Sequence, residues 1–148
     1  MIKFFIPGDP VGKERPRATS ASGCVRMYTP PKTAAYEEQV KLCARAAMAG
    51  KAPLAGAVSI RLNIGLKVPK SVSKRLQMSM LSSGTHPCKK PDIDNVIKAV
   101  CDACNGITYE DDKQIVAVEA VKSYMEETGV AVEMAEMGEG NHDQNSKA

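Results

Sequence analysis

Ten residues near the middle of the chain alternate strictly between apolar and polar side chains. In AVSIRLNIGL (57–66), Val, Ile or Leu occupies every second position, and Ser, Arg, Asn and Gly lie between them. Successive side chains of a β-strand point to opposite faces, so this period of two predicts a strand with one buried face. Such a strand needs a sheet to join and a second layer to cover its apolar side.

Other segments can supply the rest of the sheet. Ile2–Ile6 is short, apolar and β-prone, and Pro7-Gly8 ends it, which predicts a first strand. Lys113–Tyr124 and Gly129–Glu136 also carry strand patterns. A short polar turn joins them, so we expect these two strands to pair with each other as a hairpin.

Two segments have helical composition. Thr33 is the candidate N-cap of a first helix with acids in its first turn, ending at Gly50. Asp94 is the candidate cap of a second helix that runs to about Asn105. One face of that second helix is apolar and is formed by Val96, Ile97, Val100, Cys101 and Cys104. A weaker pattern predicts a short helix over Val72–Ser82.

These elements predict an α+β fold, a small mixed β-sheet with two main helices packed on one side. A chain of 148 residues that is 43% hydrophobic can bury one real core, so we expect a single domain over residues 1–137. Gly8–Gly23 is expected to be a loop, and residues 138–148 a disordered polar tail. There is no apolar run near the roughly 18 residues of a membrane span, and Met1–Ile6 is too short for a signal peptide. We therefore expect a soluble cytoplasmic protein.

Charge is distributed unevenly along the chain. Residues 1–90 have a net charge of +12, residues 91–112 of −5 and residues 113–148 of −4. A basic half beside a compact acidic cluster suits a protein that holds a polyanion on one surface and a metal on another. A solvated, lysine-rich surface explains the same numbers, and charge alone leaves both interpretations open.

The acidic cluster contains two close pairs of aspartates. Asp92 and Asp94 stand in KKPDIDN, where Pro91 favours an extended approach, so their carboxylates can converge on one point. A hard divalent cation would remove their mutual repulsion. An ordinary helix start, with Asp94 as cap, explains the pair equally well. Asp111 and Asp112 follow the helix, where the chain turns back, and are either a second half of a metal site or an exposed turn.

Several metal and phosphate motifs are excluded. An EF-hand would need Gly and an acid where Ile97 and Ala103 stand. A P-loop would need Ser or Thr at Glu14. The set His86, Cys88, Cys101 and Cys104 has a single C-x-x-C, whose cysteines fall on the apolar helix face, so buried thiols are favoured over zinc ligands. With 5 cysteines, no disulfide framework is expected.

Taken together, the segment PDIDNVIKAVCDACNGITYEDD (91–112) resembles the signature of the RusA-type Holliday junction resolvases, small dimeric endonucleases of bacteria and their phages. GDPVGKERPRA (8–18), YTPPKTAAYEE (28–38) and the later strand with Lys122 are also similar to that family, so the likeness spans about 2–124. It implies a homodimeric, Mg²⁺-dependent crossover junction endodeoxyribonuclease, with Mn²⁺ as a substitute ion. Four-way junction DNA is the implied partner, and paired symmetric nicks in recombination and repair the implied reaction.

The resemblance also implies roles for particular residues. Asp92, Asp94 and Asp112 would bind Mg²⁺, and Lys98 would assist catalysis. The matching positions Asp111, Asn95 and Asp102 are supporting residues: a candidate further ligand, a loop-positioning residue and a helical neighbour of Lys98. Carboxylates near Lys98 should keep it protonated, so it suits electrostatic stabilisation better than base catalysis. A solvated Lys98 paired with Asp102 is the alternative.

Basic residues near the motif are candidates for DNA contacts. Lys13, Arg15 and Arg17 of the GKERPR loop should reach phosphates, and Lys89 and Lys90 precede the acidic pair. Two other functions stay open: a metal-dependent nuclease of broader substrate range and a non-catalytic junction-binding protein. The segment 68–90 is longer than the family resemblance requires, and the sequence does not assign it a role.

Overall fold

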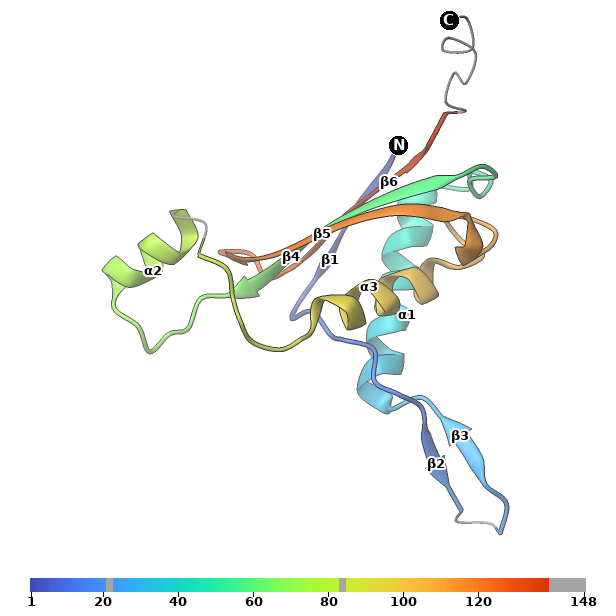
Figure 1. Ribbon diagram of the computed structural model, residues 1–148, viewed down its shortest axis with the longest axis horizontal. Coiled ribbons are helices and arrows are strands. Elements are labelled where there is room, and N and C mark those ends of the chain that lie inside the picture. The colour runs from blue at the N-terminus through green and yellow to red at the C-terminus, as the bar shows by residue number, and fades with distance from the viewer. Residues whose placement is uncertain (21–22, 83–84, 139–148) are drawn as a thin grey trace, which may run out of the picture.

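The core of the protein is a four-stranded mixed sheet, seen in a computed structural model that describes residues 1–20, 23–82 and 85–138 (Figure 1). Across the sheet the strands follow the order β1 (Ile2–Pro7), β6 (Gly129–Glu136), β4 (Val58–Lys67) and β5 (Ile115–Met125). β6 is antiparallel to both of its neighbours, whereas β4 and β5 are parallel. The mixed sheet and the α+β class are as predicted.

Two helices cover one face of this sheet (Figure 1). Helix α1 (Pro31–Met48) packs on β1 and on α3 (Ile93–Cys104). The apolar positions of β4 face them, and Ile60, Leu62 and Ile64 are at most 2% exposed. Each fully buried side chain of this kind stabilises the fold by about 1.5–3 kcal/mol. The predicted buried face of the strand and the single helical layer are both confirmed.

The predicted hairpin of the last two strands is wrong. β5 and β6 pair with opposite edges of β4, so β6 lies inside the sheet and β5 at its edge. Glycines allow the connection between them to pass the end of β4: Gly65 pairs with Gly129. A Cβ on Gly65 would lie 2.6 Å from Met125 Sδ, and one on Gly129 would lie 2.5 Å from the Ile6 carbonyl oxygen. The lack of a side chain therefore lets the end of β5 lie close to β4 at Gly65, and lets β1 lie close to β6 at Gly129.

Both helix starts differ from the predicted ones. α1 begins at Pro31, because proline at the first helical position lacks an N–H that would have no partner there. Thr33 is thus inside the helix and fully buried, and its hydroxyl accepts a hydrogen bond from Glu14 N. The first turn of α1 contains no acidic residue. In α3 the N-cap is Asp92, which moves Asp94 into the first turn.

Two small elements project from the body (Figure 1). β2 (Arg17–Thr19) and β3 (Arg26–Tyr28) form an antiparallel ribbon, so the predicted loop 8–23 contains a strand. Helix α2 (Lys74–Ser82) confirms the weak helical pattern there. A 3₁₀ turn, η1 (Asp112–Gln114), precedes β5. The predicted disordered tail, apart from Gly138, lies outside the described residues. No helix in the described ranges is long and apolar enough to cross a membrane.

Candidate active site

A surface groove opens beside the first turn of α3. Its walls are the loop 9–15, the end of β4 at 66–67 and the segment 89–92, with Asp94 and Asn95 from α3. Lys32 completes the lining. The groove therefore combines six basic side chains with four acidic ones. A smaller hollow on the other side of the sheet is lined by Arg61, Glu119 and Glu133, and there the single basic side chain is ion-paired with both acids.

The Asp92–Asp94 pair lies in this groove, at the N-terminus of α3. Asp92 occupies the N-cap position with extended backbone, but its side chain accepts no capping hydrogen bond. Neither carboxylate has a hydrogen bond or ion pair within the described part of the chain. The partial positive charge of the helix end stabilises both acids but leaves their oxygens free. The predicted cap at Asp94 is wrong, and both side chains remain available to a ligand.

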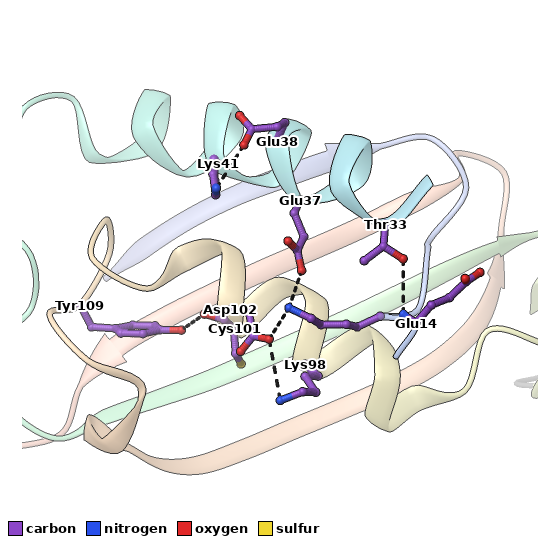
Figure 2. Close-up of polar contacts among 10 residues, drawn as sticks. Glu14, Thr33, Glu37, Glu38, Lys41, Lys98, Cys101, Asp102 and Tyr109 are labelled. Carbon is purple, nitrogen blue, oxygen red and sulfur yellow. Dashed lines mark hydrogen bonds and ion pairs between the residues drawn. The ribbon is translucent and has the colours of Figure 1, made fainter. Parts of the chain in front are cut away.

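Lys13 fixes the groove wall to both helices. Its Nζ lies 2.7 Å from Asp102 Oδ2 on α3 and 2.8 Å from Glu37 Oε1 on α1, and the side chain is 19% exposed. Figure 2 shows the dashed ion pairs converging between Glu37 and Asp102. Desolvation lowers the pKa of Lys13, but hydrogen bonds and Coulomb attraction from Asp102 and Glu37 outweigh it and raise that pKa overall. This ammonium is thus paired within the protein.

The backbone of the same loop also contacts α3. Lys13 N donates to Asn95 O at 2.9 Å. A Cβ on Gly12 would lie 3.0 Å from Asn95 Cβ, so the absence of a side chain permits the approach. Asn95, predicted to position the loop, makes this contact through its backbone carbonyl.

Lys98 forms the predicted helical pair with Asp102, at 3.8 Å (Figure 2). Lys13 Nζ lies more than 1 Å closer to the same Asp102 oxygen, so Lys13 is the main partner of that carboxylate. The Lys98 side chain stays 64% exposed. It lies one turn after Asp94, on the same face of α3. Its ammonium is therefore free to meet an anion beside the groove.

The second acidic pair lies apart from the first. Asp111 caps η1, and its carboxylate accepts from Lys113 N at 3.0 Å. That hydrogen bond, with one from Asp112, lowers the pKa of Asp111. Neither Asp111 nor Asp112 lines the groove. Across the described ranges, no three His, Cys, Asp or Glu side chains are grouped closely enough to hold a metal ion. One chain thus brings together two of the four predicted acids.

Other residues hold the turn with the second pair in place. Gln114 Oε1 accepts from Glu110 N and Asp111 N, while its Nε2 donates to Leu54 O and Gly56 O. Tyr109 is fully buried and donates its hydroxyl hydrogen to Cys101 O (Figure 2). Sequence patterns gave no signal for these contacts, because they depend on packing between distant segments.

The predicted basic residues divide into three groups. Arg15, Lys89 and Lys90 line the groove and have no ion pair with a carboxylate in the described ranges. Lys13 lines it but is already paired. Arg17 lies on β2, outside the lining, and contacts Glu14 at 3.1 Å. Lys67, missed by the sequence interpretation, also lines the groove. Its signal was its position as the first base after the alternating strand.

Residues 7–135 match the family model described as Endodeoxyribonuclease RusA. This chain belongs to the RusA family. The match contains the groove, both acidic pairs and Lys98, and the family description names a DNA-cleaving activity. The RusA-family chain is also 36% identical over 138 residues to the Uncharacterized protein YqaN of Bacillus subtilis (strain 168), a match that covers 92% of this chain and 96% of that protein.

Proposed function

We propose that this RusA-family protein is a Mg²⁺-dependent endonuclease that resolves Holliday junctions by paired nicks. The observation that carries the proposal is the unpartnered Asp92–Asp94 pair in a groove whose other walls are mostly basic. Two adjacent carboxylates without a protein counter-charge match the oxygen donors that Mg²⁺ prefers, and Mn²⁺ accepts the same donors. The donor set therefore fits the proposed ion.

The basic side chains of the groove suit the phosphates of a DNA strand. Arg15, Lys89 and Lys90 would bind phosphates on either side of the scissile one and hold the strand over the acidic pair. Lys98, exposed beside the groove, would stabilise the negative charge that develops on the phosphate oxygens as water attacks phosphorus and the leaving oxygen departs. When bound, the ion would supply Lewis acidity and a more acidic water. Lys13 would position Asp102 and the loop and would not touch DNA itself.

Two further features belong to the proposal. A homodimer would place two grooves on one junction and match the symmetry of its opposed strands. Asp112 is proposed as a third ligand, with Asp111 beside it, although Asp112 lies outside the groove lining of its own chain. Mixing Asp92→Asn with Asp112→Asn protein tests its placement. Nicking returns if Asp112 serves the groove of a second copy, because one site of each hybrid is then intact, and stays absent if it serves its own groove.

Cleavage of a mobile four-way junction tests the function directly. Wild type with Mg²⁺ should give paired symmetric nicks and leave a linear duplex intact, and EDTA or Asp94→Asn should abolish them. Asp9→Asn is the matched control, because Asp9 lines the same groove outside the pair. Equal cutting of duplex and junction would indicate a broader nuclease. Tight junction binding without cutting in either Mg²⁺ or Mn²⁺ would indicate a binding protein.

A further inference from the structure

Residues 68–82 and 85–88 form an arm that projects from the body beyond the end of β4 (Figure 1). Its only helix among the described residues, α2, has no buried side chain. The arm therefore contributes little to the core, and packing does not explain why the chain has it.

Every charged Lys, Arg, Asp or Glu side chain of the arm and of the residues that flank it is basic. Residues 67–90 contain six Lys or Arg side chains and no Asp or Glu. Lys70, Lys74 and Arg75 are exposed, and none of them has an ion pair with any described residue. Like charges gathered without a counter-charge repel each other, so this surface is complementary to a polyanion.

Both ends of the arm lie in the groove wall. Lys67 and Lys89, which flank it in sequence, line the groove. The segment 85–89, which returns from the arm to the body, is held in place by β5. His86 Nδ1 lies 3.0 Å from Lys122 O, and Lys122 Nζ donates to Lys89 O at 2.6 Å. Lys89 Nζ also lies 5.6 Å from the centre of the Tyr124 ring. A polymer that leaves the groove on this side therefore meets the arm.

The arm has internal contacts that fix its shape. Gln77 Nε2 donates to Val72 O at 3.2 Å and to Pro69 O at 3.4 Å, which ties α2 to the chain that leads into it. Ser73 Oγ accepts from Leu76 N at 3.3 Å and caps the helix. The basic side chains of the arm are thus held on a short element that is fixed by its own hydrogen bonds.

We propose that the arm is a second DNA-binding surface, on which Lys70, Lys74 and Arg75 contact phosphates of the duplex that leaves the groove. The inference rests on the proposed function, since it takes the groove to be the cleavage site. Lys74 and Arg75 are the first two residues of α2 and Lys70 precedes it by four residues, so the proposed contacts belong to the first part of the arm. Phosphate contacts carry no sequence information, so the arm would add affinity and orientation to any junction.

The test is the salt dependence of junction binding in EDTA, where no cleavage occurs. Log K falls as log salt rises. Changing Lys70, Lys74 and Arg75 together to Gln should make this fall less steep, by about 0.9 in the slope for each lost contact. The affinity advantage of wild type over the variant should then shrink about 40-fold from 50 to 200 mM salt. The control changes Lys3, Lys41 and Lys51 to Gln, which removes the same charge outside the groove lining and should leave the slope near that of wild type.

A hydroxyl-radical footprint of wild type gives a second measurement that needs no variant. Protection should extend beyond the nicked phosphate onto the one duplex arm that meets Lys70, Lys74 and Arg75. A variant slope equal to the control slope, or protection that stops at the groove, overturns the arm proposal while nicking by wild type still upholds the function. A change in oligomer mass without a change in slope would instead assign the arm to a second protein copy and also overturn it. Failure of wild type to bind junctions overturns the proposed function first.

Discussion

The ammonium of Lys13 lies 2.7 Å from the Asp102 carboxylate, and this contact joins the basic N-terminal loop to the helix that carries Asp94. Glu37 adds a link to α1 at 2.8 Å. One side chain thus ties three segments together beside the groove. Because the pairing uses the charge of Lys13, the DNA contact that we propose for this loop falls to Arg15, which lines the groove without an ion pair to a described carboxylate, and Lys98 keeps most of its exposure.

Removal of Lys13 should therefore destabilise the fold. Lys13→Met leaves the partly buried Glu37 without its counter-charge and Asp102 with only the longer contact to Lys98, and we expect the free energy of unfolding to fall by about 1–3 kcal/mol. Urea denaturation measures it. Lys3→Met is the control, because its ion pair with Glu133 at 3.6 Å is largely exposed and should be worth less than about 1 kcal/mol. Equal losses in the two variants would mean that the buried pairing stabilises the fold no more than the exposed one.

Mg²⁺ should stabilise the wild-type protein and should not stabilise variants of the acidic pair. An ion that binds only the folded state, at a concentration 100 times its Kd, raises the free energy of unfolding by about 2.7 kcal/mol. Asp92→Asn and Asp94→Asn should abolish this gain. Without metal, each should cost at most about 1 kcal/mol, because neither carboxylate has a protein partner and each loses mainly its interaction with the helix end. Thermal melts with Mg²⁺ and with EDTA test this, and an undiminished Mg²⁺ effect in both variants would place the ion elsewhere.

The sequence predicted the class and layers of the fold, because periodicity records which face of an element is buried. The alternation in β4 and the apolar face of α3 both matched the core. Strand pairing was not predictable in the same way. β6 alternates in burial and β5 does not, but neither pattern states which edge of β4 the strand joins. That choice depends on packing between distant segments, including the close approaches at Gly65 and Gly129, which a single sequence does not reveal.

Of the four acids predicted for the site, Asp92 and Asp94 line the groove, and their metal-binding role stays a prediction. These two are only two residues apart, so their placement in one groove follows from local backbone geometry, whereas the internal pairing of Lys13 was not predicted. Lys13 reaches Glu37 and Asp102 only through the packing of three segments far apart in sequence, and from sequence its charge looked like that of Arg15. The position of Asp112 likewise depends on Gln114 and its long-range contacts, beyond what spacing could establish.

Gly129 should tolerate substitution much less well than Gly65. A Cβ at Gly129 would meet the backbone oxygen of Ile6 at 2.5 Å, so the pairing of β6 with β1 must shift. At Gly65 the nearest atom is the sulfur of the flexible Met125 side chain. We expect Gly129→Ala to cost about 3 kcal/mol or more and Gly65→Ala about 1–2 kcal/mol. Chemical denaturation of both variants measures the difference in the free energy of unfolding. A larger loss for Gly65→Ala would contradict the contacts described here for the two glycines.

Stability should fall in mildly alkaline solution because of two buried thiols. Burial, as the largest cause, raises the pKa of Cys101 to about 11 and that of Cys104 to about 12. In the unfolded chain both thiols ionise near pH 8.5, so above that pH the unfolded state binds fewer protons than the folded state. The stabilisation is therefore complete below about pH 8.5 and is lost as pH rises toward the folded-state values. We expect a decrease of roughly 3 kcal/mol between pH 8.5 and 10 from the two thiols together.

Urea titrations at several pH values would measure this loss, and a variant with alanine at both positions provides the comparison. Cys101→Ala with Cys104→Ala should lower stability at pH 7, because two small side chains are removed from the core, but should flatten the decline between pH 8.5 and 10. Cys24→Ala with Cys88→Ala is the matched control, since both of those thiols are exposed. It should retain the wild-type decline. A decline that persists unchanged in the Cys101 and Cys104 double variant would assign the alkaline sensitivity to other groups.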